Sequence, residues 1–309
     1  MAVLTAPGAR TTTPSRSEER AARWSRRAPL LPALIFTIVV TQLPFLLTLW
    51  YSLQSWNLVR PGSRHFVGLR NYADVFADSV FRGAVVHTVL ITAGCVVISL
   101  LVGLGLALLL DRRFIGRGVV RTLLITPFLV MPVASALLWK YMMLDPVYGI
   151  VNWALSPFGA GDEDWVVSHP MWSVILVLVW QWTPFMMLLL LAGLQAQPRD
   201  VLEAASVDGA SRWRTFVHIT LPHLRRYIEL STLLGAIYVV NTFDQIYMLT
   251  QGGPGTASSN LPFYIYQRAF LGFDVGQSAA MGVVVVIGTI IVATVALRTI
   301  FKSFELEKS

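Results

Sequence analysis

The stretch from Ala84 to Leu110 limits the possible folds of this chain more than any other feature. It contains 27 residues without a single Asp, Glu, Lys or Arg. At a rise of 1.5 Å per residue it would form about 40 Å of α-helix, which exceeds the roughly 30 Å of a bilayer's hydrocarbon core. Because a helix satisfies its own backbone polar groups, such a run is expected to cross a membrane.

Five further apolar runs have a similar length, and the composition agrees with them. Hydrophobic residues make up 55% of the 309 residues and charged residues 13%, roughly half the charged fraction of a soluble domain. We therefore predict an all-α, polytopic membrane protein with six transmembrane helices. Prolines inside several runs free backbone carbonyls, which favours a packed bundle around a cavity. The runs cover residues 30–52, 84–110, 119–143, 171–194, 227–249 and 277–301.

The distribution of Lys and Arg predicts which segments face the cytoplasm. With the N-terminus inside, 18 of the 24 basic residues fall in cytoplasmic segments, so both termini are expected there. The loop at residues 144–170 carries four acidic residues and no basic one, as expected of an external loop. The first external loop is the exception, because it contains Arg60, Arg64, Arg70 and Arg82.

The predicted organisation has three segments. A basic cytoplasmic tail (1–29) precedes a six-helix membrane domain (30–305), and a short cytoplasmic tail (306–309) follows it. The first tail is expected to be either disordered or partly an amphipathic helix on the membrane surface. The net charge of +7 follows from the basic ends of the spans, so membrane lipid, and no nucleic acid, is expected as a partner. The single cysteine, Cys95, is expected to be buried.

The sequence lacks catalytic and metal-binding patterns. The Gly-rich segment Gln251–Gly255 has no following Lys, so we expect a turn and not a phosphate-binding loop. His218 and His223 do not form a His-Glu-x-x-His pattern, and no Gly-x-Ser-x-Gly elbow is present. We therefore predict no catalytic residue, metal site or cofactor in this chain, which disfavours an integral membrane enzyme.

A polar segment at about 197–223 separates the fourth and fifth runs on the cytoplasmic side. After Pro198 we predict a short helix with Asp200 in its first turn, where the helix dipole favours an acidic residue, and Gly209 at its end. A second helical piece follows from about Ser211, and Leu221-Pro222 is expected to turn the chain back to the membrane. The residue pattern alone fits either a docking surface for a partner or an ordinary solvated loop.

The spacing of Glu203-Ala204-Ala205, Gly209 and Ile219-x-Leu221-Pro222 resembles the EAA motif of permease subunits in bacterial binding-protein-dependent ABC importers. Three further stretches resemble the sugar and polyol branch of that family, which includes maltose and glycerol-phosphate permeases. These stretches are Trp180–Phe185, Leu249–Pro254 and Tyr264–Phe270. The resemblance extends over residues 30–305, and the first 29 residues lie outside it.

The resemblance implies a type I ABC importer permease fold in the bacterial inner membrane, with a coupling helix that docks in a groove of a cytoplasmic ATPase subunit. Glu203 would pair there with a basic residue. The implied partners are two such ATPases, which hold ATP and Mg²⁺, a second homologous permease and an extracytoplasmic solute-binding protein. The implied ATPase-coupling residues are Glu203, Ala204, Ala205, Asp208, Gly209, Ile219, Leu221 and Pro222.

The fifth run holds the densest set of polar residues inside a span, and polar residues there are candidates for function. Four of them, at positions 238, 241, 242 and 245, fall at helical spacing on one face. The resemblance implies that this region lines the cavity of a transported sugar; the alternative is hydrogen bonding to a sister subunit. The predicted pathway residues are Tyr238, Asn241, Asp244 and Gln245, with Gln181 and Trp182 from the fourth run.

A sugar or polyol suits these polar groups, and a glycerol-phosphate ester stays open as an alternative solute. A transporter that works alone is the other reading. It would require an inverted repeat and carboxylates deep in several spans, and the sequence has neither.

Overall fold

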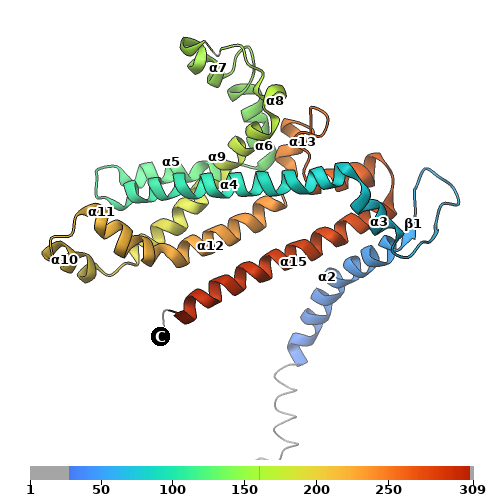
Figure 1. The fold of residues 1–309 in the computed structure, drawn as a ribbon, viewed down its shortest axis with the longest axis horizontal. Helices are drawn as coiled ribbons and strands as arrows, with labels where there is room; N and C mark the ends of the chain where they lie inside the picture. The colour runs from blue at the N-terminus through green and yellow to red at the C-terminus, as the bar shows by residue number, and fades with distance from the viewer. Residues whose placement is uncertain (1–27, 160, 307–309) are drawn as a thin grey trace, which may run out of the picture. The chain divides into compact units, whose positions relative to one another are not determined.

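The computed structural model describes residues 28–159 and 161–306, and most of this backbone is helical (Figure 1). The predicted amphipathic helix of the basic tail falls outside the described residues. In chain order the helices are η1 (Ala28–Leu30), α2 (Leu31–Ser52), α3 (Arg70–Ala77), α4 (Ser79–Asp111), α5 (Arg117–Leu129), α6 (Pro132–Leu138), η2 (Trp139–Met143), α7 (Ile150–Leu155), η3 (Ser156–Phe158), α8 (Trp165–Ser168), α9 (Pro170–Gln195), α10 (Arg199–Val207), α11 (Arg212–Thr215), η4 (Phe216–Thr220), α12 (Leu221–Val240), α13 (Asp244–Leu249), α14 (Leu261–Tyr266), η5 (Gln267–Leu271) and α15 (Val275–Leu306).

Within the described residues, three helices are long and apolar enough to cross a membrane: α2, α4 and α9. The third predicted run is a pair of helices bent by 100° at the break between Leu129 and Pro132. A residue before proline avoids the helical region, and Met131 accordingly has a ψ of 139°. The fifth run is divided, and the described apolar part of α15 ends at Ile291. The count of six spans therefore stays a prediction.

The chain divides into two units, the first ending at Trp50 and the second beginning at Tyr51. Within the first unit, large apolar side chains of α2 such as Leu34, Phe36 and Leu46 are exposed. A helix that is apolar on all sides suits lipid. The hydroxyl of Thr48 donates to the carbonyl of Pro44, four residues earlier, so this polar side chain is satisfied inside the helix.

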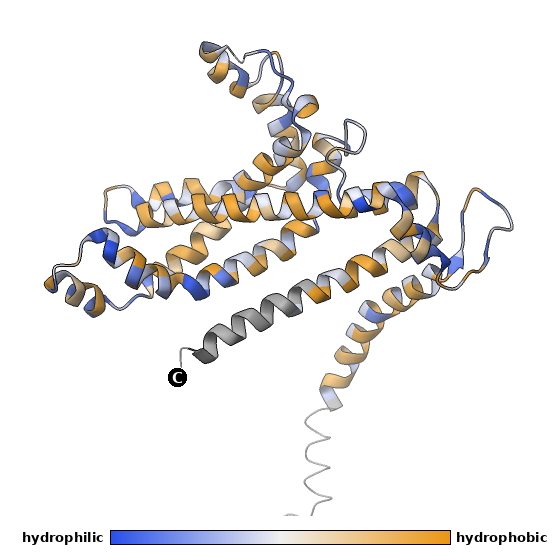
Figure 2. Ribbon diagram, in the orientation of Figure 1, coloured by the Kyte–Doolittle hydropathy of each residue, from blue (hydrophilic) through white to orange (hydrophobic). Residues whose placement is uncertain are grey.

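The core of the second unit is built by α4, α9 and α12, which pack against one another. A Cβ at Gly103 would lie 3.0 Å from the backbone nitrogen of Met187, so the glycine permits close contact between α4 and α9. Ala107, one turn on, and Cys95 are completely buried. The prediction that Cys95 is buried is thus confirmed. Figure 2 shows hydrophobic residues along α4 and hydrophilic residues at its two ends.

The first loop, which the sequence predicts to be external, folds as a small hairpin and attaches to the start of α15. Strands β1 (Gln54–Ser55) and β2 (His65–Phe66) pair antiparallel. The backbone N–H of Leu58 donates to the carbonyl of Phe273, and that of Val275 donates to Trp56, both at 2.9 Å. A Cβ at Gly276 would lie 2.2 Å from the carbonyl oxygen of Gln54, so only glycine permits this approach.

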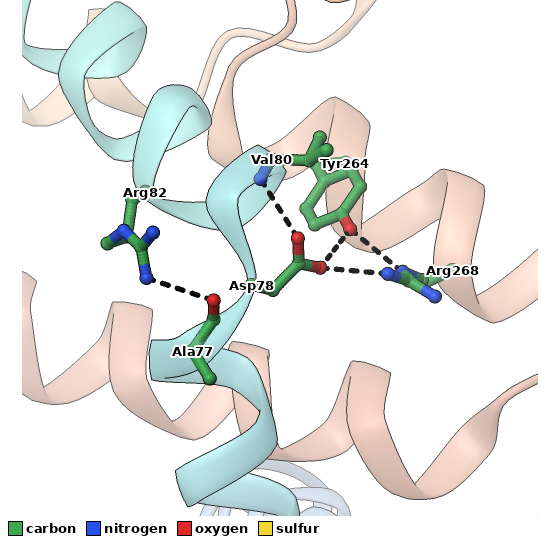
Figure 3. Close-up of polar contacts among 6 residues, drawn as sticks. All are labelled: Ala77, Asp78, Val80, Arg82, Tyr264 and Arg268. Atoms are coloured by element: carbon green, nitrogen blue, oxygen red, sulfur yellow. Dashed lines mark hydrogen bonds and ion pairs between the residues drawn. The ribbon is translucent and has the colours of Figure 1, made fainter.

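Next to this hairpin, Asp78 links the start of α4 to α14 and η5 (Figure 3). One of its oxygens accepts from the Val80 backbone N–H and caps α4. The other accepts from the Tyr264 hydroxyl at 2.5 Å and from Arg268 Nη2 at 2.8 Å. Burial raises the pKa of Asp78, but the hydrogen bonds from Tyr264, Val80 and Arg268 outweigh it, so the pKa lies below its ordinary value of 3.8.

Candidate functional site

Helix α10, in the polar segment at about 197–223, is short and has a defined C-terminal cap. The N–H of Gly209 donates to Ser206 and that of Ala210 donates to Ala205, at 3.2 and 3.0 Å. Together with a φ of +74° at Gly209, this is the pair of bonds that ends a helix in a Schellman motif. The predicted helix and its glycine stop are confirmed, with Val207 as its last residue.

One side of α10 is buried and the other is open. Ala205 is buried, whereas Glu203 and Ala204 are exposed and Val207 is 87% exposed. Trp213 in α11 is also largely exposed, at 72%. Isolated exposed apolar residues are common, but Val207 lies four residues after Glu203 and shares its exposed face of α10, which suits a partner.

The prediction that Leu221-Pro222 turns the chain is wrong. Helices α11, η4 and α12 continue into one another, and Pro222 is the second residue of α12. The N–H of Leu221 donates to Phe216, five residues earlier, which is a π-helical turn. This wider turn precedes the proline, which has no N–H to donate, so the helix direction persists. The C-terminal part of the motif is consequently the base of α12: Ile219 and Leu221 are partly buried and Pro222 is exposed.

The base of α12 is fixed to the end of α9. His223 Nε2 lies 3.1 Å from the carbonyl oxygen of Gly193. A Cβ at Gly193 would lie 2.6 Å from the ring of Tyr227, so the two helices are in close contact here. Arg225 and Glu229 form an ion pair of 2.9 Å at the same end of α12. The base of α12 is therefore held against the end of α9.

The predicted polar face of the fifth run is wrong, because that run is not one helix. Helix α12 ends at Val240, and α13 begins at Asp244 after a break. The side chain of Asn241 donates to the carbonyl of Ile237 at 2.8 Å and so competes with continued helix formation. Asp244 lies in the first turn of α13 and is partly buried. Tyr238 and Gln245 lie on different helices.

Gln181 on α9 joins both broken runs. Its Nε2 donates at 2.9 Å to the carbonyl of Val130, at the break between α5 and α6. Its Oε1 accepts from Gln245 Nε2 on α13 at 2.8 Å. Both glutamines are only 5% exposed. The structure thus brings these two predicted residues together, and the pair satisfies a backbone carbonyl freed at the break between α5 and α6.

Trp182 and Tyr238 form the second pair among the predicted pathway residues. Their rings stack at 5.3 Å with an interplanar angle of 22°. Phe128 and Phe185 pack around Trp182 at 5.6 and 5.9 Å. Tyr238 is 56% exposed, so this aromatic cluster presents an open face. Such faces bind the apolar side of a sugar ring, while nearby amides hydrogen-bond hydroxyl groups.

Sequence reasoning missed the contact of Asp78 with Tyr264 and Arg268. The stretch Tyr264–Phe270 was singled out only by its resemblance to a family. The one local signal was an Asp immediately before a long apolar helix, which is a typical N-cap position.

Residues 97–303 match the family described as "Binding-protein-dependent transport system inner membrane component". The chain belongs to this family. It is a transport component of the inner membrane, and its family role is transport and not catalysis. The trehalose/maltose permease protein MalF of Thermococcus litoralis is 38% identical, over 82% of this chain and 86% of that protein. The trehalose permease protein SugA of Mycobacterium tuberculosis H37Rv is 36% identical, over 82% and 81%.

The fold of this inner membrane component is also that of a solved importer. A chain from a bacterial ABC transporter that imports the acidic polysaccharide alginate has a TM-score of 0.73 and is 22% identical. The match covers 95% of this chain and 99% of that one. The permease fold implied by the sequence motif is thereby confirmed.

Proposed function

We propose that this chain forms half of the translocation pathway of an ATP-driven importer for a sugar or polyol. The observation that carries the proposal is the capped helix α10 with its exposed Glu203, which lies in the chain between the end of α9 and the base of α12. The base of α12 is held against the end of α9 by the contacts of His223 and Tyr227. Those two helices also hold Gln181, Trp182 and Tyr238. Similarity to permeases named for trehalose and maltose supports a sugar as solute.

The energy for transport would come from partner subunits. Two cytoplasmic ATPases would bind ATP and Mg²⁺ and receive α10, with Glu203 pairing with a basic residue. A second homologous permease would complete the pathway, and an extracytoplasmic solute-binding protein would deliver the solute. Both termini would lie in the cytoplasm, as the bias of Lys and Arg favours. Movement of the ATPases would displace α10 and, through His223 and Tyr227, the ends of α9 and α12.

The solute would meet polar groups and an aromatic face near the breaks in the helices. Tyr238 offers its exposed ring, and Asn241 and Asp244 lie beside the break that follows α12. The six pathway residues include one carboxylate and no Lys or Arg. This composition suits the hydroxyl groups of a neutral solute better than a phosphate ester, which needs a cationic partner.

Reconstitution tests this function. The chain, its partner permease and the ATPase would be placed together in liposomes with ATP inside and the binding protein with labelled trehalose or maltose outside. Uptake that requires all components is the expected result. Uptake by this chain alone, driven by an ion gradient, would contradict the proposal.

A further inference from the structure

A polar pocket of about 450 Å³ lies between the first external loop and the start of α15, away from the predicted sugar pathway. Its lining residues come from the hairpin, from α3, and from the stretch between η5 and α15. Val67 and Gly272 are its only lining residues without a polar side chain. The lining residues are Ser55, Asn57, Arg60, Ser63, His65, Val67, Arg70, Asn71, Asp74, Arg268, Gly272, Asp274 and Gln277.

The four arginines of the first predicted external loop divide into two pairs, of which only one lines the pocket. Arg64 is used inside the hairpin, because its Nε donates to Gln54 Oε1 at 2.9 Å and its guanidinium lies 4.5 Å from the centre of the Trp56 ring. Arg82 donates to the carbonyls of Phe76 and Ala77 and caps α3. These two arginines have structural partners, and neither lines the pocket.

Arg60 and Arg70 differ from them. Both are exposed and line the pocket, and neither guanidinium has a hydrogen bond or ion pair within the described residues. Among the pocket carboxylates, Asp274 accepts from the N–H of Gln277 and so caps α15. Arg268 is held by Asp78. Asp74, four residues after Arg70 on α3, is the other carboxylate of the lining. Arg60 and Arg70 therefore face the cavity as guanidinium groups that form no ion pair with either carboxylate of the lining within the described residues.

Hydrogen bonds hold two of the residues that line the pocket, Asn57 and Asn71. Asn57 Nδ2 donates to the carbonyl of Gly272 at 3.2 Å and joins the two sides of the pocket. Asn71 is buried, and its Nδ2 donates to the carbonyls of Ser52 and Gln54, both at 2.8 Å. A preformed site loses little conformational freedom on binding, which favours affinity.

We propose that this pocket receives an acidic side chain of the solute-binding protein, with Arg60 and Arg70 as its ligands. Guanidinium groups bind carboxylates through paired N–H donors, and the pocket lacks the aromatic face that a sugar ring would use. The proposal rests on the proposed function and on the topology that places this loop outside.

The other external loop favours a protein over a lipid headgroup as the source of the anion. Residues 144–170 carry four acidic side chains and no basic one. An anionic lipid surface would be repelled by that loop. A protein surface with patches of both signs can match both loops, and it can do so in one orientation.

The test measures the Kd of the purified, solute-loaded binding protein for the complete transporter in phosphatidylcholine nanodiscs. Arg60→Glu/Arg70→Glu is expected to weaken binding about tenfold or more at low salt, with a smaller difference at about 300 mM salt. Arg60→Lys/Arg70→Lys keeps the charges and is expected to lose less. Arg70→Gln and Arg82→Gln are matched single variants, since each removes one arginine of the same loop; only the first is expected to weaken binding.

ATP hydrolysis without binding protein shows that each variant is folded and assembled. An unchanged Kd for Arg60→Glu/Arg70→Glu in an assembled transporter would overturn the proposal. Weakening only in nanodiscs that contain phosphatidylglycerol would overturn it in favour of a lipid headgroup. If the wild-type transporter neither binds the binding protein nor is stimulated by it, the result contradicts the proposed function. The proposal for the pocket, which rests on that function, is then contradicted as well.

Discussion

Gln181 and Gln245 share a buried hydrogen bond of 2.8 Å between α9 and α13, two helices from different parts of the chain. The other end of the Gln181 amide satisfies the carbonyl of Val130. A single side chain thereby satisfies a carbonyl at one helix break and bonds to the helix that follows the other break. Broken helices are tolerated inside a membrane only where other groups complete their hydrogen bonds.

Replacing Gln181 by Leu is expected to destabilise the protein by about 2–3 kcal/mol, because the Val130 carbonyl and the Gln245 amide both lose a buried partner. Gln245→Leu leaves only one group unpaired and should cost less, about 1–2 kcal/mol. Thermal unfolding of the purified chain in detergent measures both. The double variant provides the control, since coupling between the two sites makes the effects less than additive. Fully additive effects would contradict the shared bond.

The sequence predicts the long helices well and their interruptions poorly. Run 84–110 lies wholly inside α4, because apolar length alone determines a spanning helix. The break at residues 241–243 is not evident from the sequence, since no proline or glycine marks it. The groups that complete it, such as the Asn260 amide on the Thr242 carbonyl, are distant in the chain. Pro132 gave a local signal for the other break, although its angle depends on packing.

The same limit applies to the candidate sites. The motif from Glu203 to Gly209 could be predicted, because its helix, its cap and its exposed face depend on neighbouring residues. The pair of Asp78 and Arg268 spans 190 residues, and no local pattern indicates it. The predicted turn at Pro222 failed because a π-helical turn in front of the proline removes the conflict.

Asp78→Asn tests the contact of Asp78 with Tyr264 and Arg268, measured at different pH values. Asn can still cap α4, so the variant removes the charge and weakens the bonds to Arg268 and Tyr264. We expect a loss of about 1 kcal/mol, a small value because Arg268 is 38% exposed. The folded pKa of Asp78 lies below its ordinary value of 3.8. Its contribution is therefore complete above that value and is lost as the pH falls through the folded pKa.

The measurement is thermal unfolding of wild type and Asp78→Asn between about pH 8 and about pH 3. The difference in stability attributed to this group should be constant from pH 8 to about pH 5 and should shrink only below the ordinary pKa. Tyr264→Phe removes one of the hydrogen bonds and serves as a second variant. A difference that disappears between pH 7 and pH 6 would point to another titrating group.

Gly209→Ala should loosen the end of α10. Its φ of +74° is unfavourable for a residue with a Cβ, at a cost of about 1 kcal/mol. The surroundings are open, so the effect comes from the backbone and not from a clash. Gly105→Ala is a matched control, because Gly105 lies within α4, has open space around it and does not have a positive φ. We expect reduced solute-stimulated ATP hydrolysis in the first variant only.

Glu203→Lys tests the role of α10 most directly. Glu203 is exposed on a helix whose opposite side holds the buried Ala205, so the change should leave insertion and folding intact. If a partner cation faces Glu203, a lysine there replaces an attraction with a repulsion in a partly buried socket. The cost should be a few kcal/mol, or more than tenfold in coupled activity. ATP hydrolysis and uptake would be measured on the same liposomes, and uptake per ATP should fall. Asp111→Lys makes the same charge change on the exposed residue that ends α4, and it should leave that ratio unchanged. Equal ratios in the two variants would mean that α10 does not contact the ATPase through Glu203.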